Sequence, residues 1–150
     1  AAGLHSVPHA GEMSGPETIW EAVERLGAER IGHGISAVRD PGLVARLREA
    51  GIPLEVCPTS NVCTGQVAAI EEHPLPVMLA EGLVVTVNTD DPPMFGTTLT
   101  REYLNLAHVF GLGAGEIAGI ARNAVRASFM PEAGKAALLA GIDEALAAAS

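Results

Sequence analysis

Residues 82–96 read GLVVTVNTDDPPMFG and place a strand-like apolar run directly before two adjacent carboxylates, Asp90 and Asp91. The run is nearly continuous rather than alternating, which is typical of a strand covered on both faces, as in a parallel sheet. Two close carboxylates raise the pKa of one of them unless a cation or hydrogen-bond donors stabilise both charges. The pair therefore indicates a functional site where this strand ends.

Strands and helices alternate along the chain around this stretch. Apolar runs predict four short strands, at residues 3–10, 29–34, 52–58 and 83–90. Helical spacing predicts helices between them, at residues 16–28, 40–51 and 73–82. Asp40 is a suitable N-cap and Gly51 a suitable C-terminal stop for the helix at 40–51. Three further helices are predicted after residue 96.

This order predicts an α/β fold with a parallel sheet and right-handed crossovers. Four βα units followed by helices form either half of an eight-stranded barrel or a small doubly wound sheet. No linker-like segment divides the chain, so residues 1–150 are predicted to belong to one domain. The two open sheet edges of such a unit favour association with another chain or with a second copy in a homo-oligomer.

The composition is typical of a globular protein with an aliphatic core. The 150 residues are 48% hydrophobic and only 3% aromatic, with a net charge of −9. Nucleic acid is not expected as a partner, because phosphate binding needs a basic surface. No apolar stretch approaches the roughly 20 residues of a membrane span, and the start of the chain lacks the pattern of a secretory signal. A cytoplasmic location without a membrane partner is therefore expected.

Polar residues follow each of the four predicted strands. They are His9, Gly11 and Glu12 after the first, His33 at the end of the second, Thr59, Ser60 and Asn61 in a hydroxyl-rich loop after the third, and Asp90 and Asp91 after the fourth. The carboxyl ends of parallel strands meet at one edge, where ligands bind in both candidate architectures. Each group alone would also fit a helix start or a tight turn, so the prediction of a site depends on their combination.

The residue types at this edge suit a catalytic zinc. Imidazole nitrogens and a carboxylate oxygen are common zinc ligands in sites that leave one position open for water. Bound zinc lowers the pKa of that water from about 15.7 to about 7, and a nearby glutamate can transfer protons. Asp90 and Asp91 fit this scheme if one binds the metal and the other binds the ligand.

Four segments, in this order, resemble motifs of the adenosine deaminase family of the amidohydrolase superfamily. They are HAGE at 9–12, RIGHG at 30–34, PLEVCPTSNV at 53–62 and VNTDDP at 87–92. The resemblance implies a metal-dependent hydrolase with a TIM-type (β/α)8 barrel. This chain would cover about the C-terminal half, namely the last four βα units and the C-terminal helices. LHSVPHAGE and DPPMFGT also resemble the aminodeoxyfutalosine deaminase branch of this family.

The resemblance also implies a role for each motif residue. His9 and Asp90 would bind zinc, and Asp90 would also orient the attacking water. Glu12 would protonate the purine ring at N1, and His33 would position the water and help to deprotonate it. Asp91 would hydrogen-bond the purine at N7. The implied reaction is zinc-dependent deamination of a 6-aminopurine nucleoside, adenosine to inosine and ammonia, with adenine and aminodeoxyfutalosine as alternative substrates.

Gly11 and the PTSN loop at 58–61, including Ser60, would line the substrate pocket or support the residues that line it. The family's other two zinc ligands form a His-x-His pair on the first barrel strand, and this sequence has no such pair. The resemblance therefore implies that the N-terminal half of the barrel is a partner that supplies these ligands, and that this chain alone is inactive. The alternative from another class is a non-catalytic purine-binding module or an inactive fragment.

The other histidines and both cysteines are predicted to be structural. His5 lies outside the first motif, His73 precedes a predicted helix, and His108 lies inside one. Cys57 and Cys63 are too few for a disulfide framework and lack the spacing of cysteine-ligated zinc deaminases. Both are expected to pack in the interior, where free cysteine is common.

Overall fold

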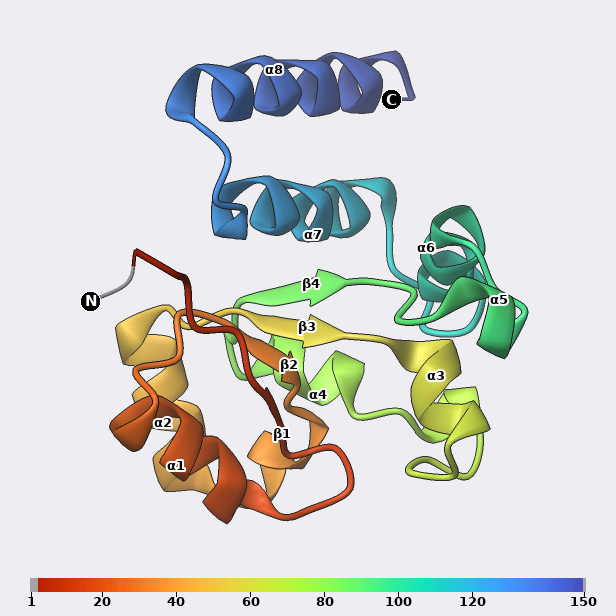
Figure 1. Ribbon diagram of the computed structural model, residues 1–150. Coiled ribbons are helices and arrows are strands. Elements are labelled where there is room, and N and C mark those ends of the chain that lie inside the picture. The colour runs from red at the N-terminus through yellow and green to blue at the C-terminus, as the bar shows by residue number, and fades with distance from the viewer. Residues whose placement is uncertain (1–2, 150) are drawn as a thin grey trace.

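The structure, a computed structural model, describes residues 3–149 and contains a parallel four-stranded sheet in the order β1-β2-β3-β4 (Figure 1). The strands are β1 (His9–Ala10), β2 (Ile31–His33), β3 (Leu54–Val56) and β4 (Val85–Val87). The helices are α1 (Pro16–Arg25), η1 (Ile35–Arg39), α2 (Pro41–Ala50), α3 (Pro58–Cys63), η2 (Ile70–Glu72), α4 (Leu75–Ala80), α5 (Pro92–Phe95), α6 (Leu99–His108), α7 (Ala114–Ala127) and α8 (Glu132–Ala148). No helix in this described part is long and apolar enough to cross a membrane. The predicted α/β class and parallel sheet are confirmed.

Parallel pairing brings the carboxyl ends of all four strands to one edge of the sheet. β1 pairs with β2 so that Ala10 lies opposite His33, and β3 pairs with β4 so that Val56 lies opposite Val87. The segments that follow these residues therefore leave the sheet side by side. This is the edge at which the sequence predicts the functional site.

Helices cover one face of the sheet and continue beyond β4. α1, α2 and α4 lie below the strands in Figure 1, while α7 packs against β4 and α8 packs against α7. Fully buried aliphatic side chains fill the space between helices and sheet. They include Ile19, Leu43, Leu47, Leu54, Leu75, Met78 and Val85. Burial of each large side chain stabilises the fold by roughly 1.5–3 kcal/mol, so this core fixes the strand ends in place.

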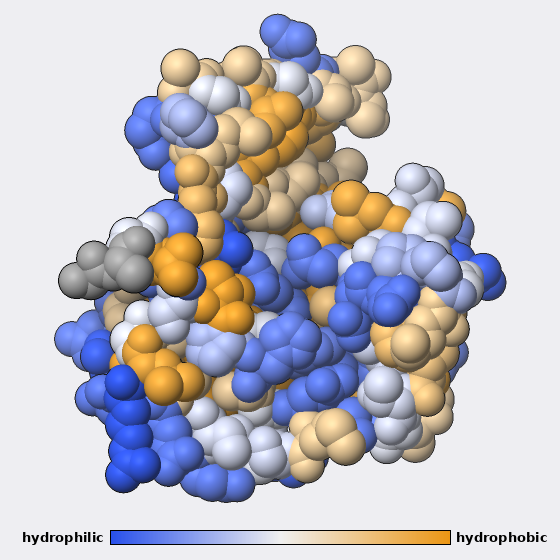
Figure 2. All heavy atoms as spheres, viewed as in Figure 1, coloured by the Kyte–Doolittle hydropathy of each residue, from blue (hydrophilic) through white to orange (hydrophobic). Residues whose placement is uncertain are grey.

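The other face of the sheet is polar. Figure 2 shows hydrophilic side chains gathered over the strands in the middle of the view. The polar residues on this face include Arg30, Glu55, Thr86 and Asn88. α8 has no buried residue and carries the half-exposed Leu138. α8 is thus largely exposed, whereas the polar residues of the sheet face are partly covered and Thr86 is buried.

One helix is bounded as predicted. The Asp40 carboxylate caps α2 by accepting from the N–H groups of Gly42 and Leu43 at 2.9 and 3.1 Å. The Trp20 indole donates to its other oxygen, and this bond, followed by the cap bonds, lowers the pKa of Asp40. Gly51 ends the helix with a φ of 65°, in the left-handed region that glycine adopts without strain.

The strands are shorter than predicted, and one predicted loop is a helix. The first strand, predicted over 3–10, is reduced to His9–Ala10. Ser60 and Asn61, predicted to lie in a loop, belong to α3. The Thr59 N–H in the first turn of α3 donates to the Glu102 carboxylate of α6 at 3.2 Å, across a sequence separation of 43. The prediction of a loop at Ser60 and Asn61 was wrong, because the Glu102 carboxylate that bonds the first turn of α3 is remote in the sequence.

Candidate active site

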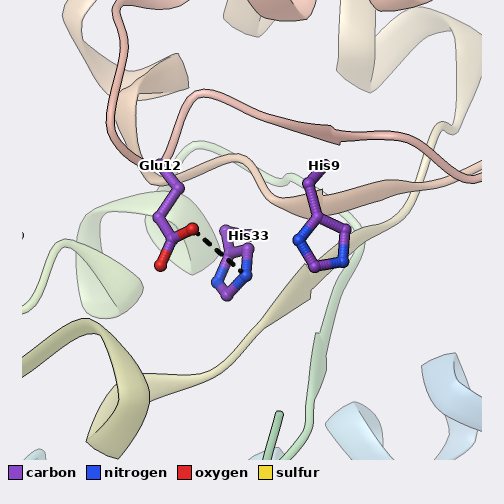
Figure 3. Close-up of side chains that lie close together, drawn as sticks. All are labelled: His9, Glu12 and His33. Atoms are coloured by element: carbon purple, nitrogen blue, oxygen red, sulfur yellow. Dashed lines mark ion pairs between the residues drawn. The ribbon is translucent and has the colours of Figure 1, made fainter. Parts of the chain in front are cut away.

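Three side chains from β1, the turn after it and β2 converge at the carboxyl edge of the sheet (Figure 3). They are His9, Glu12 and His33, and one ligand atom of each lies within 4.8 Å of the others. His33 Nε2 is 3.5 Å from Glu12 Oε2. The rings of His9 and His33 meet edge to face, with centroids 4.9 Å apart. The sequence motifs HAGE and GHG therefore form one spatial group, as predicted.

The position of His9 depends on a glycine in the neighbouring strand. Gly32 lies opposite His9 in the parallel register. A Cβ at this position would lie 2.5 Å from His9 Cδ2 and 3.1 Å from its Nε2. Any other residue at position 32 would therefore displace the His9 ring.

We expect Gly32→Ala in the full-length protein to weaken zinc binding by about 10- to 100-fold, the range found when groups supporting a metal ligand are changed. Stability should change little, because His9 is exposed and its ring can rotate outward. Zinc titration against a competing chelator measures the effect. Gly119→Ala is the matched control, because a methyl group there meets nothing within 4 Å. Equal zinc affinity of the two variants would contradict the assignment of His9 as a ligand.

Two residues of the site have a strained backbone. His33 and Asp90, with φ of 63° and 56°, are the non-glycine residues with positive φ among residues 3–149. This left-handed conformation is uncommon for residues with a side chain and is concentrated at functional sites. His33 is the last residue of β2, and Asp90 lies in the segment between β4 and α5. Both residues were selected as site residues from the sequence, which gives no sign of this strain.

The two aspartates after β4 have different surroundings. Asp90 Oδ2 accepts a hydrogen bond from Ser60 Oγ at 2.7 Å and lies 3.9 Å from His33 Nε2. Asp91 is exposed, and its carboxylate has no partner among the residues the structure describes. Asp91 is also the N-cap residue of the short helix α5, but its side chain accepts no cap bond. Asp90 is thus held in place, and Asp91 is free to bind a ligand.

Asn61 connects the site to the protein interior, which the sequence did not reveal. Its Nδ2 lies 3.3 Å from Glu12 Oε1 and 3.2 Å from His33 Nδ1. Its Oδ1 lies 3.2 Å from His73 Nε2. Asn61 was noted as a polar residue after the third strand, but the spacing of residues does not show which groups an amide contacts.

Glu102 is a second feature that the sequence did not reveal. It lies inside α6, is fully buried, and accepts hydrogen bonds from the Thr59 N–H and the Thr97 hydroxyl. The first bond ties α6 to the N-terminus of α3, the helix that carries Ser60 and Asn61. Glu102 therefore supports the site without facing it. Its helical surroundings in the sequence resemble those of an ordinary exposed glutamate.

The site borders a cavity of about 250 Å³ whose lining includes His9, His33, Cys57 and Asp90. Burial lowers the pKa of His33 and His9 adds to this, whereas Glu12 and Asp90 oppose it. Burial, followed by the charge of Asp90, raises the pKa of the Cys57 thiol to about 12. Cys57 is therefore protonated at neutral pH and poorly suited to act as a nucleophile or metal ligand.

His73 is a buried structural histidine, as predicted. Its Nδ1 accepts the Leu75 N–H at 3.0 Å, and its Nε2 lies 3.2 Å from Asn61 Oδ1. Burial lowers its pKa from 6.5 to about 4. Between about pH 4 and pH 6.5, His73 binds a proton in the unfolded chain but not in the folded chain. Stability therefore falls as the pH is lowered through this window.

We expect His73 to account for a loss of about 3 kcal/mol in the free energy of unfolding between pH 6.5 and pH 4. Urea unfolding of the zinc-free full-length protein at several pH values measures this loss. His73→Gln is the control, because glutamine keeps a donor but does not titrate. A pH dependence that is the same in both proteins would contradict the assignment.

The remaining candidates have varied surroundings. Gly11 packs against Ile19 and has a φ of 66°, and its N–H donates to Thr18. This is a packing position, and a substrate contact of Gly11 stays a prediction, as it does for Ser60. Cys57 is buried as expected, but Cys63 is exposed, so its predicted interior packing was wrong.

The other two histidines lie on the surface. His5 is exposed, forms an ion pair with Glu29 at 2.6 Å and stacks on Phe129 at 3.5 Å. His108 is exposed at the end of α6. Neither belongs to the group of His9, Glu12 and His33, and their structural role stays a prediction.

The donors at this edge fit a zinc ion with an incomplete ligand set. His9 is exposed and has no hydrogen-bond partner among residues 3–149, so its ring can bind a metal. Asp90 provides a carboxylate on the same cavity, although it lies outside the close group of His9, Glu12 and His33. Imidazole and carboxylate are zinc donors, but catalytic sites usually have three protein ligands. The ligand pair of His9 and Asp90 stays a prediction.

Comparison with known sequences identifies close relatives. A family model described as adenosine deaminase matches residues 1–145. The aminodeoxyfutalosine deaminase of Streptomyces avermitilis is 55% identical over 148 residues, which are 99% of this chain and 41% of that protein. The adenosine deaminase of Serratia proteamaculans is 46% identical over 137 residues, which are 91% of this chain and 41% of that protein.

Solved structures agree with these relatives. The adenine deaminase of Arthrobacter aurescens, at 43% identity, matches with a TM-score of 0.93 over 95% of this chain and 44% of its own. An amidohydrolase of Burkholderia ambifaria with bound Zn, at 27% identity, matches with a TM-score of 0.85 over 98% of this chain and 43% of its own. The predicted fold class, part of an amidohydrolase TIM barrel, is confirmed. The chain spans about two fifths of the length of the curated relatives, and it belongs to the adenosine deaminase family.

Proposed function

We propose that the protein containing this chain is a zinc-dependent aminohydrolase that deaminates a 6-aminopurine nucleoside. The observation that carries the proposal is the convergence of His9, Glu12, His33 and Asp90 at the carboxyl edge of the sheet. Hydrolytic deamination needs an activated water, a proton donor for the ring and a proton acceptor for the water. These residue types can supply all three functions.

His9 and Asp90 are the residues of this chain that would hold the zinc, together with two histidines from the N-terminal half of the barrel. The metal, when bound, would act as a Lewis acid that makes water reactive at neutral pH. Zinc bound to Asp90 would also relieve its repulsion from Asp91. The hydrogen bond from Ser60 to Asp90 leaves the second carboxylate oxygen available for the metal.

The protein groups would divide the proton transfers between them. Glu12 would give a proton to the purine N1, His33 would position the attacking water and help to deprotonate it, and Asp90 would orient that water. His33 lies 3.5 Å from the carboxylate of Glu12 and 3.9 Å from that of Asp90, so it would hold the water between them. Asp91, whose carboxylate has no partner within the described residues, would hydrogen-bond the purine at N7.

Aminodeoxyfutalosine is a second candidate substrate beside adenosine. The relative with that activity is 55% identical to this chain, whereas the adenosine deaminase is 46% identical. Ammonia release from adenosine, adenine and aminodeoxyfutalosine by the full-length zinc-loaded protein tests the proposal. We expect at least one of them to be deaminated. Absence of ammonia release from all three would favour a non-catalytic purine-binding module.

We further propose that activity requires the N-terminal half of the barrel as a partner for this chain. The polar sheet face and the exposed apolar side chains of α8 are surfaces for that contact. The enzyme would act on a small molecule in the cytoplasm, without a nucleic acid or membrane partner. Zinc content and turnover of the 150-residue chain alone test this. One tightly bound zinc with full turnover would overturn it, and self-association into a homo-oligomer would show a second use of the open edges.

A further inference from the structure

We propose that Asn61 and His73 are positioning residues that hold the His33 imidazole in one neutral tautomer, with its proton on Nε2 and facing the reaction site. The sequence placed Asn61 at the edge that carries the site but gave it no contact, and it predicted His73 to be structural. The inference rests on the proposed function for its catalytic meaning. Its structural content, the direction of a chain of hydrogen bonds, can be tested without any turnover.

At the inner end of this series of hydrogen bonds, the contacts of His73 determine which groups donate and which accept. The Leu75 backbone N–H points at His73 Nδ1 at a distance of 3.0 Å. A backbone N–H can only donate, so His73 Nδ1 must be the unprotonated nitrogen. The ring proton of neutral His73 is therefore on Nε2, and it is donated to Asn61 Oδ1 at 3.2 Å.

At the outer end of the series, the contact with Glu12 independently requires the same direction of donation. Asn61 Nδ2 lies 3.3 Å from Glu12 Oε1, and a carboxylate oxygen there accepts a hydrogen bond. Reversing the Asn61 amide would place its oxygen against Glu12 Oε1, so that two acceptors would meet. It would also place the NH2 group against the His73 Nε2–H, so that two donors would meet. Both ends therefore fix the orientation of the amide.

The orientation of Asn61 determines the tautomer of His33. The Asn61 NH2 group has two protons, one directed to Glu12 and the other to His33 Nδ1 at 3.2 Å. His33 Nδ1 must accept, so a neutral His33 carries its proton on Nε2. Asn61, His33 and His73 are 0%, 2% and 3% exposed. Water cannot easily replace a lost partner there, so the opposite tautomer would leave buried groups unpaired.

This tautomer refines the role of His33. Its Nε2–H faces Glu12 Oε2 and Asp90 Oδ2 at 3.5 and 3.9 Å. Neutral His33 can therefore donate a hydrogen bond to the attacking water or to the oxygen that forms from it, but it cannot take the proton of that water at Nε2. Asp90 is left as the proton acceptor, and His33 is left to hold and stabilise the oxygen.

Nuclear magnetic resonance of the full-length zinc-loaded protein, labelled with ¹⁵N in its histidines, tests the proposal. We expect His33 and His73 each to show a protonated Nε2 and an unprotonated Nδ1 at neutral pH. A protonated Nδ1 on neutral His33 in the wild-type protein would overturn the proposal, whether or not the protein deaminates any nucleoside. This measurement also decides the question if a variant fails to fold.

Two substitutions then test the relay. Asn61→Asp replaces the NH2 group with a second acceptor, so His33 should move its proton to Nδ1 and kcat should fall by about 10²-fold or more, with KM changed less. His73→Gln keeps a donor toward Asn61 Oδ1 and should retain the His33 tautomer and most of kcat, whereas His73→Leu should lose both. An unchanged His33 tautomer in Asn61→Asp, or equal behaviour of the two His73 variants, would contradict the relay.

Discussion

The Glu12→Gln variant of the full-length enzyme should lose about 10²–10⁴-fold in kcat, the usual contribution of a general acid–base group. Glutamine has nearly the same shape but cannot deliver a proton to the purine N1. Its amide oxygen can still accept the Asn61 N–H, which now bonds Glu12 Oε1 at 3.3 Å. Zinc content and nucleoside affinity should therefore be kept, because the variant changes the proton and not the position of the side chain.

Steady-state kinetics, zinc analysis and nucleoside titration separate these effects. Glu49→Gln, a change of the same kind on the exposed end of α2, is the matched control and should behave as wild type. An unchanged kcat in Glu12→Gln would refute the proton-donor role. Loss of zinc from this variant would instead make Glu12 a metal ligand, which its place in the group with His9 and His33 also permits.

The part of the site that follows from strand ends could be predicted from the sequence. In a parallel sheet the carboxyl ends of the strands share one edge, so polar residues after apolar runs must meet. His9, His33 and Asp90 were predicted together on this basis and lie on one cavity. Local signals were also sufficient for the cap of α2, because Asp40 bonds N–H groups only two and three residues away.

The supporting contacts could not be predicted, because they join residues that no local pattern relates. α3 is held by Glu102, 43 residues from Thr59. His73 was correctly predicted to be structural, yet its contact with Asn61 connects it to the site. Burial on a short helix depends on what packs against it, and so Cys63 is exposed although interior packing was expected. Sequence patterns thus locate the chemical groups, whereas tertiary contacts determine their orientation and protonation.

The second large effect concerns Asp90, where a strained backbone and a functional carboxylate coincide. Asp90→Ala and Asp90→Gly both remove the proposed zinc ligand and the acceptor for Ser60 Oγ. Both should therefore lose bound zinc and at least about 10²-fold in turnover, since the proton acceptor is lost as well. Zinc analysis and steady-state kinetics measure this, and retention of zinc with turnover in either variant would contradict the role of Asp90.

The two variants should differ in stability in an unusual direction. Glycine normally destabilises a folded chain relative to alanine, by roughly 0.5–1 kcal/mol, because it loses more conformational freedom on folding. At a φ of 56°, however, a residue with a Cβ carries a penalty of roughly 1–2 kcal/mol that glycine avoids. We therefore expect the zinc-free Asp90→Gly protein to be more stable than Asp90→Ala by up to about 1 kcal/mol in urea unfolding. The opposite order would show that the turn relaxes when the carboxylate is removed. The expected order would show that the fold imposes this conformation at position 90 independently of zinc and of the contact with Ser60, so that the backbone itself aims the carboxylate at the site.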